Sequence, residues 1–432
     1  MSKKGFLIIS LVLILVSSVF FSTYYGYNFW LKKISSAKTF STSNQDLDNS
    51  SSFQSSSKKE IPKPKNLYLN TLFFGDVFWG RRINKWSEAS ELKTAYPFSG
   101  LNTLEREKYD IWIADLECPS TNQKLTDNQE EVELKFNCNS NYLPEAAKWF
   151  DAFTLANNHM DNMEEFSGLE VTRNNLQENN IQYFGHFDNV QKQDLCEVVS
   201  FKTRKNKDEK SGKISTKKIE NSSSNSFSTT NSQDEIEKDY YIPIAMCGFH
   251  NVFKLPKDDE MAVITEYSKY FPTIVMPHQG KEYTTVADGL QNSYFREMID
   301  LGADAVLGNH PHSVQNTEAY KNKLIVYSMG NFIFDQQSEP LVTQGIGVNL
   351  DFSFKYDENL DKTQEFAESC QKFKDNCLQK AKELNLQKPN FEIKYDIIAT
   401  DNSGKLAKKA TPQVQENMLV RTNWKKTLSN LK

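Results

Sequence analysis

The sequence predicts an α/β protein behind an N-terminal hydrophobic segment. Short apolar runs of strand length alternate with helical or long polar connections along the body of the chain. Several of these runs end in Asp, Glu, Asn or His, which a buried strand has no packing reason to carry. In open α/β sheets, functional sites form at the carboxyl ends of the strands, so these polar endings predict one shared site.

The N-terminal segment, residues 1–33, predicts a membrane anchor. It contains an uncharged, mostly apolar stretch from Gly5 to Leu31 that is long enough to span a bilayer as a helix. Aromatic residues gather at its far end, and no small-residue cleavage site is found. We therefore expect an uncleaved single-pass anchor in the cell membrane, with a cleaved signal peptide as the alternative.

The body of the chain is expected to lie outside the cytoplasm, since its start resembles an export signal. Lysines flank both ends of the apolar stretch, so a cytoplasmic body is the alternative. The chain has 432 residues and a net charge of -5, which gives no sign of a nucleic-acid partner.

Composition divides the remaining chain into a main domain with additions. Residues 34–65 are polar and end in prolines, as in a flexible tether. The main domain runs from 66 to 356, and its residues 202–238 have almost no apolar content, which predicts a disordered insertion. A charged helical insertion, 357–389, and a C-terminal strand and tail, 390–432, follow.

The regular elements of the main domain are predicted from apolar runs and helical composition. Strands are expected at 67–74, 111–114, 151–156, 196–201, 241–249, 273–277, 305–307, 324–329, 345–355 and 391–399. Helices are expected at 144–150, 164–177 and 293–301.

Six cysteines without C-x-x-C spacing argue against a cysteine zinc site. An even number in an exported protein permits disulfides, with Cys118–Cys138 and Cys196–Cys247 as candidate pairs. Cys370 and Cys377 would lie about 10 Å apart in one straight helix, too far to be bridged. Six free, buried thiols are the alternative that the sequence leaves open.

The most informative stretch is 304–335, where two short apolar runs each end in polar residues. His310 and His312 follow the first run, and side chains two apart in a strand share a face. Pro311 between them cannot join a sheet ladder, which places the pair at the end of the strand. Two imidazoles on one side of a stiff loop are good metal ligands, and a plain surface turn is the alternative.

The other strand endings supply further ligand candidates. The full set of expected metal ligands is Asp76, Glu117, Asn158, His278, His310 and His312. Such mixed oxygen and nitrogen ligands suit two divalent cations such as Mn, Fe or Zn. Two ions about 3.5–4 Å apart can clamp both oxygens of a phosphoryl displacement. His159, beside Asn158, could then protonate the leaving oxygen. Taken singly, Asp76 could be a turn residue and Asn158 a helix N-cap.

In order, the motifs GD, LE, NNH, H and HPH resemble those of the calcineurin-like metallophosphoesterase superfamily. Within it, the chain is similar to the CapA family of bacterial capsule and poly-gamma-glutamate synthesis proteins. The resembling segments are 73–81, 113–119, 155–162, 276–283, 307–315 and 327–336. The resemblance implies a central β-sandwich flanked by helices, a two-metal centre in the six ligands and His159 as the acid or transition-state donor. It also implies Arg81, Glu282 and Asn331 as substrate-binding residues, although Arg81 could instead be solvated surface.

The chain departs from these patterns at several positions. The superfamily's first motif is usually Asp-x-His, but Phe78 stands in the place of that histidine. Glu117 replaces the usual Asp of the second motif. Relative to the CapA pattern, the common Asn, Trp and His are replaced by Asp115, Gln279 and Asn309. The second ion is therefore expected to bind weakly, or only together with substrate.

Two classes of function follow from the resemblance. The first is an extracytoplasmic metal-dependent hydrolase acting on a phosphoester or an amide-linked anionic polymer during capsule synthesis. The second is a non-catalytic envelope component that binds polyglutamate or assembly partners. Other capsule-synthesis membrane subunits are expected partners in both cases. The complete set of ligand candidates favours the first class, and the missing histidine favours the second.

Overall fold

The computed structural model describes residues 63–207, 239–371 and 376–431. The expected anchor, nearly all of the tether and most of the 202–238 insertion lie outside the described residues. Within those ranges, no helix is both long enough and apolar enough to cross a membrane.

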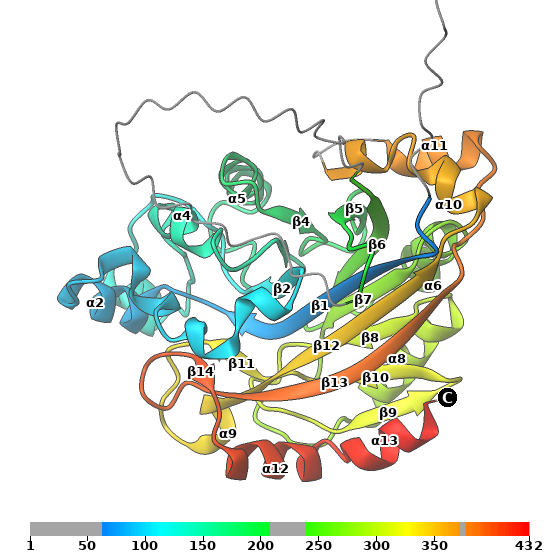
Figure 1. Cartoon of the computed structure of the whole chain (residues 1–432). Helices are drawn as coiled ribbons and strands as arrows, with labels where there is room; N and C mark the ends of the chain where they lie inside the picture. Colours follow the sequence, from blue (N-terminus) through cyan, green and yellow to red (C-terminus); the bar gives the residue numbers. More distant parts are fainter. Residues whose placement is uncertain (1–62, 208–238, 372–375, 432) are drawn as a thin grey trace, which may run out of the picture. The chain divides into compact units, whose positions relative to one another are not determined.

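Two β-sheets form the centre of the described chain, which is the mixed α/β class expected from the sequence (Figure 1). The first sheet has the order β14-β13-β12-β1-β2-β3-β4, with β11 beside β1. Its strands are β1 (Asn66–Val77), β2 (Ile111–Leu116), β3 (Ala152–Thr154), β4 (Gln182–Phe184), β11 (Asn331–Ile333), β12 (Gln344–Lys355), β13 (Phe391–Asp401) and β14 (Lys408–Lys409).

The second sheet has the order β5-β6-β7-β8-β10-β9. Its strands are β5 (Cys196–Lys202), β6 (Tyr241–His250), β7 (Thr273–His278), β8 (Ala305–Leu307), β9 (Thr317–Tyr320) and β10 (Lys323–Val326). The strands β1 to β4 are parallel to one another, as are β6, β7, β8 and β10. Each sheet therefore gathers the carboxyl ends of four strands at one edge.

The two sheets pack face to face over a shared apolar core. In β1, Leu67, Leu69 and Phe73 enter this core, because alternate side chains of a strand point to the same face. Ile274 and Met276 of β7 enter the same core from the second sheet. The polar residues that end β2 and β7 continue these inward-facing rows, so the fold directs them into the space between the sheets.

Helices cover the outer faces. Over the first sheet lie α2 (Arg81–Ala89), α4 (Leu143–Ala146) and α5 (Phe166–Glu178), and over the second lie α6 (Asp258–Met261), α7 (Val263–Ser268) and α8 (Gly289–Asp300). The remaining helices are α3 (Asp127–Glu131), α9 (Pro340–Thr343), α10 (Glu358–Thr363), α11 (Cys377–Glu383), α12 (Pro412–Arg421) and α13 (Trp424–Asn430). Short 3₁₀ helices are η1 (Lys93–Phe98), η2 (Leu101–Leu104), η3 (Arg106–Lys108), η4 (Ser140–Tyr142) and η5 (Ala367–Gln371).

All ten expected strands coincide with strands of the structure. The four strands that were not expected, β4, β9, β11 and β14, are two to four residues long, too short to show a period. The helix expected at 144–150 ends early, at Ala146.

Three disulfides join all six cysteines, so the alternative of free thiols is wrong. Both candidate pairs are present, and Cys196 and Cys247 are directly opposed across β5 and β6. The third pair, Cys370–Cys377, was judged too far apart on the assumption that both residues lie in one straight helix. This assumption is wrong. Cys370 lies in η5 and Cys377 begins α11, so the two elements bring their Cα atoms to 5.9 Å.

Candidate metal centre

The polar residues that end the parallel strands meet between the two sheets. Asp76 is at the end of β1, Glu117 and Asn158 follow β2 and β3, His278 ends β7, and His310 and His312 follow β8. Asp76, Glu117 and His278 are fully buried, and His310 and His312 are nearly so. The structure thus brings all six expected ligands to one place.

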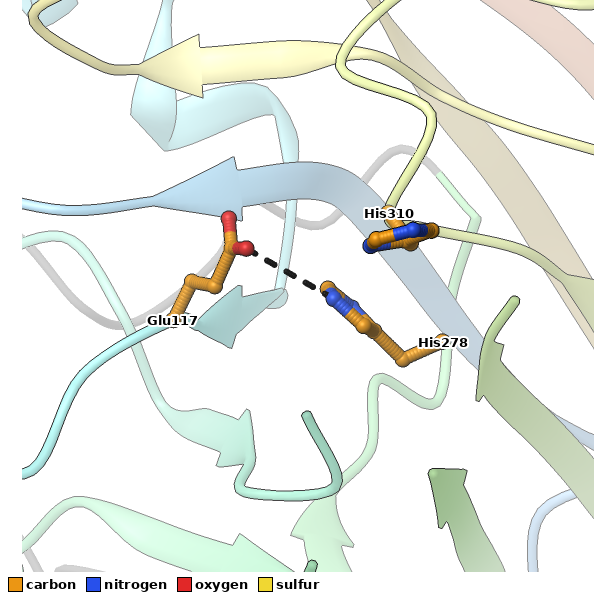
Figure 2. A group of neighbouring side chains, drawn as sticks. All are labelled: Glu117, His278 and His310. Atoms are coloured by element: carbon orange, nitrogen blue, oxygen red, sulfur yellow. Dashed lines mark ion pairs between the residues drawn. The ribbon is translucent and has the colours of Figure 1, made fainter. Parts of the chain in front are cut away.

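Glu117 lies at the centre of this group. Its Oε1 atom is 3.6 Å from Nε2 of His278 and 3.8 Å from Nε2 of His312. Figure 2 shows His278 and His310 beside its carboxylate. Donor atoms of Glu117, His278 and His310 lie within 4.8 Å of one another, and so do those of Asp76, Glu117 and His312. Two overlapping sets of three donors therefore share Glu117.

His278 is oriented by Asp115, which also belongs to a donor group with Asp76 and His278. Its Nδ1 lies 2.7 Å from Oδ2 of Asp115, and its Nε2 lies 2.8 Å from Oδ1 of Asn158. A protonated His278 donates to both oxygens, and a cation held by Nε2 and Oδ1 would take the place of the Nε2 proton. A carboxylate behind a ligating imidazole is the usual support of such a site.

His310 and His312 occupy a turn rather than a strand. Their φ angles are 94° and 55°, a region that few residues other than glycine adopt. The two imidazoles therefore reach the site through a strained turn around Pro311, and not through the alternation of a strand. Backbone strain of about 1–3 kcal/mol per residue persists only where surrounding contacts impose it.

Asn331 fixes the orientation of His312. Its Nδ2 donates to the carbonyl of Val342, so its Oδ1 faces Nδ1 of His312 at 2.9 Å. Nδ1 must then donate, so Nε2 is the nitrogen of His312 that faces Glu117. The Nδ1 of His312 also lies 3.2 Å from Oδ2 of Asp76.

The site concentrates opposite charges in a buried space. Burial disfavours the imidazolium, but Asp115 and Glu117 outweigh it and raise the pKa of His278 to about 10. Burial likewise opposes the charge of His312, while Glu117 and Asp76 raise its pKa to about 9. Burial, partly offset by His312, raises the pKa of Glu117 to about 7. The two imidazoles are therefore protonated, and the carboxylates stabilise their positive charge. A bound divalent cation would supply positive charge in place of these protons.

The donor set fits divalent cations. Neither carboxylate oxygen of Glu117 has a hydrogen-bond partner among the described residues, and neither does Nδ1 of His310. Buried polar atoms are rarely left unpaired, so these orphan atoms point to a ligand. Carboxylate, amide and imidazole donors together suit Mn, Fe or Zn.

His159 stands at the edge of the group with its ring stacked on Phe136, the ring centroids 3.6 Å apart. Oδ1 of Asn162 accepts from the backbone N–H of Phe136 and lies 3.0 Å from Nδ1 of His159. Nδ1 therefore carries a hydrogen, and Nε2 faces Oε1 of Glu117 at 3.9 Å. Burial lowers the pKa of His159 to about 3, so the imidazole is neutral.

The three expected substrate-binding residues lie in different settings. Arg81 is buried, and its guanidinium forms two hydrogen bonds with Asp335 and lies over the Phe136 ring. Asn331 is buried against His312. Glu282 is exposed in the loop after β7. Only Glu282 of the three has a side chain turned to solvent, and contact with a substrate stays a prediction for all of them.

Sequence reasoning assigned no role in the site to several residues that the structure places there. Asp115 follows Ile111 and Ile113 on the inward face of β2, a period of two that could have revealed it. His250 is in register with His278, and its Nε2 is buried without a hydrogen-bond partner in the described chain. Asn162 acts from three residues beyond His159, and no local pattern indicates it.

Comparison with known proteins gives matches over most of the described chain. The family described as "Bacterial capsule synthesis protein PGA_cap" matches residues 70–336. The PGA biosynthesis protein CapA of Bacillus subtilis (strain 168) is 27% identical over 304 residues, which cover 66% of this chain and 69% of that protein. The capsule biosynthesis protein CapA of Bacillus anthracis is 43% identical over 63 residues, 15% of each chain. A crystal structure of a hypothetical protein from Thermus thermophilus covers 76% of this chain and 98% of its own, with 14% identity and a TM-score of 0.34, too low to support a common fold.

Proposed function

The chain belongs to the bacterial capsule synthesis protein family PGA_cap, and from this premise we propose that it is a metal-dependent hydrolase of capsule or poly-gamma-glutamate synthesis. The names of the two CapA relatives support this setting. The proposed enzyme has the calcineurin-like metallophosphoesterase fold, a β-sandwich flanked by helices. Its substrate is an anionic polymer with phosphoester or amide linkages.

The observation that carries the proposal is the pair of donor sets that share Glu117. Asp76, Glu117 and His312 would hold one divalent cation. Glu117, His278 and His310, with Asn158 beside them, would hold the second. When bound, such cations polarise the group under attack and make water a nucleophile at neutral pH.

His159 is the proposed proton donor to the leaving group. Its Nδ1 is held by Asn162, so Nε2 on the Glu117 side is the nitrogen that can exchange a proton. Burial keeps the pKa of His159 near 3 in the ligand-free protein. The negative charge of a bound substrate must therefore raise this pKa before His159 can act as an acid.

The three disulfides support a location outside the cytoplasm, where such bonds form and persist. We propose that residues 1–33 anchor the chain in the cell membrane with its body on the outer side. Other membrane subunits of capsule synthesis are the proposed partners.

A second function is favoured by Phe78, which replaces the histidine of the Asp-x-His motif. Phe78 is fully buried and packs on Phe136 and Phe334, with ring centroids 4.5 and 5.4 Å away. The set of Asp76, Glu117 and His312 therefore has only three donors. A non-catalytic component that binds polyglutamate or assembly partners would need no second ion.

The test measures the metal content, melting temperature and hydrolytic activity of the full-length protein, with phosphodiesters and γ-linked polyglutamate as substrates. His278→Ala and His310→Ala should lose bound metal. They should also lose the stability that metal gives the wild type, about 2.7 kcal/mol when the free metal is at a hundred times its Kd. Unchanged metal in both variants would overturn the metal centre. Full metal and tight polymer binding without cleavage would support the second function.

A further inference from the structure

A cavity of about 480 Å³ lies on one side of Tyr283, outside the candidate metal ligands. Arg82, Tyr283, Val342 and the segment 336–339 line it, and we refer to it as the side cavity. The Tyr283 ring lies against the His312 ring, with centroids 6.0 Å apart. A ligand in the side cavity would therefore be next to the candidate metal centre.

Hydrogen bonds connect the side cavity with the metal centre. Nδ2 of Asn331, whose Oδ1 faces His312, donates to Oε1 of Gln336 at 2.9 Å. Nε2 of Gln336 then donates to the hydroxyl oxygen of Tyr283 at 3.0 Å. Because this hydroxyl accepts from Gln336, its own hydrogen points elsewhere, and no acceptor for it is found in the described chain. The Tyr283 hydroxyl is thus a donor available to a ligand.

The side cavity holds one cationic side chain and one carboxylate, which suits a ligand that carries both a carboxylate and an amide N–H. Among the described residues Arg82 forms one ion pair, with Glu131 at 4.0 Å, and both side chains are exposed, so this pair is weak and can be replaced by a ligand. Glu339 also lines the cavity, and its carboxylate would repel a doubly charged phosphate while accepting from an amide N–H. Val342 is the aliphatic side chain of the lining and is almost fully buried.

We propose that the side cavity binds one glutamyl unit of a γ-linked chain, next to the bond that reacts at the metal centre. This inference rests on the proposed function. Arg82 and the Tyr283 hydroxyl bind the free α-carboxylate of the unit. Glu339 accepts from the backbone amide of the chain, and Val342 contacts the methylenes between them.

The test measures the affinity of the metal-loaded full-length protein for a short γ-linked oligoglutamate. Arg82→Gln and Tyr283→Phe should each weaken binding, by about tenfold for the loss of a hydrogen bond to a charged group. Arg296→Gln is the matched control. It removes an equal charge from α8, where Arg296 pairs with Glu318 outside the side cavity, and should leave the affinity unchanged.

Two comparison probes, inorganic polyphosphate and α-linked oligoglutamate, define the ligand class. Wild-type binding that is unaffected by both variants would overturn the side cavity as a subsite while leaving the proposed function in place. Equal losses for polyphosphate would show a general anion site and overturn the glutamyl assignment. Failure of the wild type to bind either oligoglutamate would overturn the inference and remove polyglutamate from the proposed substrates, while the phosphoester alternative of the proposed function would remain.

Discussion

The Nδ1 atom of His278 lies 2.7 Å from Oδ2 of Asp115, and both side chains are buried. The other oxygen of Asp115 accepts from Nδ2 of Asn157 at 2.9 Å. Asp115 is therefore held between two partners, and its charge acts on the imidazole that faces Glu117 and Asn158. The carboxylate both orients His278 and increases the basicity of its Nε2.

We expect Asp115→Asn to weaken metal binding about 10- to 100-fold, as is usual for the loss of such a supporting carboxylate. The amide can still accept a hydrogen bond, so the fold should persist while the charge is lost. Isothermal titration calorimetry with Mn²⁺ or Zn²⁺ measures the change in metal affinity. Asp300→Asn, at an exposed acid of α8, is the control. An affinity equal to that of the wild type would remove Asp115 from the support of the site.

The Cys118–Cys138 disulfide connects two parts of the site. Cys118 directly follows Glu117, and Cys138 lies two residues after Phe136, which stacks on His159. Replacing both cysteines by serine should lower the free energy of unfolding by about 3 kcal/mol, because the bond closes a loop of 20 residues. It should also lower turnover more than metal content, since the support of His159 is loosened.

The matched control replaces Cys370 and Cys377 by serine. This pair joins η5 and α11 and touches none of the metal ligand candidates. It should lower stability without changing the turnover of the folded protein. Equal turnover in both double variants would show that the first disulfide has no role in the site.

Stability should also depend on pH through Glu197 on β5, away from the metal centre. Burial and the neighbouring Asp194 raise the pKa of Glu197 to about 8, above its ordinary value of 4.5. The folded state therefore binds this proton more tightly than the unfolded state. The resulting stability is fully present below about pH 4.5 and is lost as the pH rises through about 8.

Glu197→Gln should remove this part of the pH dependence. Urea unfolding at about pH 5 and about pH 9 should show a smaller loss of stability in the variant, by roughly 1–3 kcal/mol. The exposed Glu392→Gln should behave as the wild type. If wild type and Glu197→Gln lose the same stability over this range, Glu197 does not hold its proton in the folded state.

Much of the architecture could be predicted because the strands are long or clearly apolar. The alternation in β12 and β13 and the apolar run of β7 identify these strands directly. The helices α12 and α13 were expected only as part of a strand and tail. Their contribution to the core, through Met418 and Trp424, depends on contacts that the local sequence does not reveal.

The candidate site was predictable in its members but not in its geometry. Asp76, Glu117 and His278 were identified because each of them follows or ends an apolar run of strand length. His310 and His312 were expected on one side because alternate residues of a strand share a face. In the structure they lie in a turn with positive φ angles, so strand alternation is not the cause of their common direction. Asn331, whose contact with substrate stays a prediction, also orients His312, a role that the sequence did not indicate. Such roles depend on which strands become neighbours.

His159 separates the two proposed functions, because its ring faces the site without belonging to a donor group. If the protein is a hydrolase, His159→Asn should keep metal content and melting temperature near those of the wild type. Turnover should fall about 100- to 10,000-fold, which is typical for the loss of a positioned acid. If the protein only binds polymer, the same change should alter affinity modestly, with no turnover to lose.

Asn162→Ala gives an independent test of the same role. It removes the acceptor that holds Nδ1 of His159, while the imidazole and the six ligand candidates stay in place. A hydrolase should then lose turnover in both variants, with the smaller loss in Asn162→Ala, because the acid is present but less well oriented. Cleavage by His159→Asn at the wild-type rate would keep the enzyme and remove His159 from its mechanism. Loss of metal in His159→Asn would instead show that the imidazole is a ligand, because a pure proton donor contributes nothing to metal affinity.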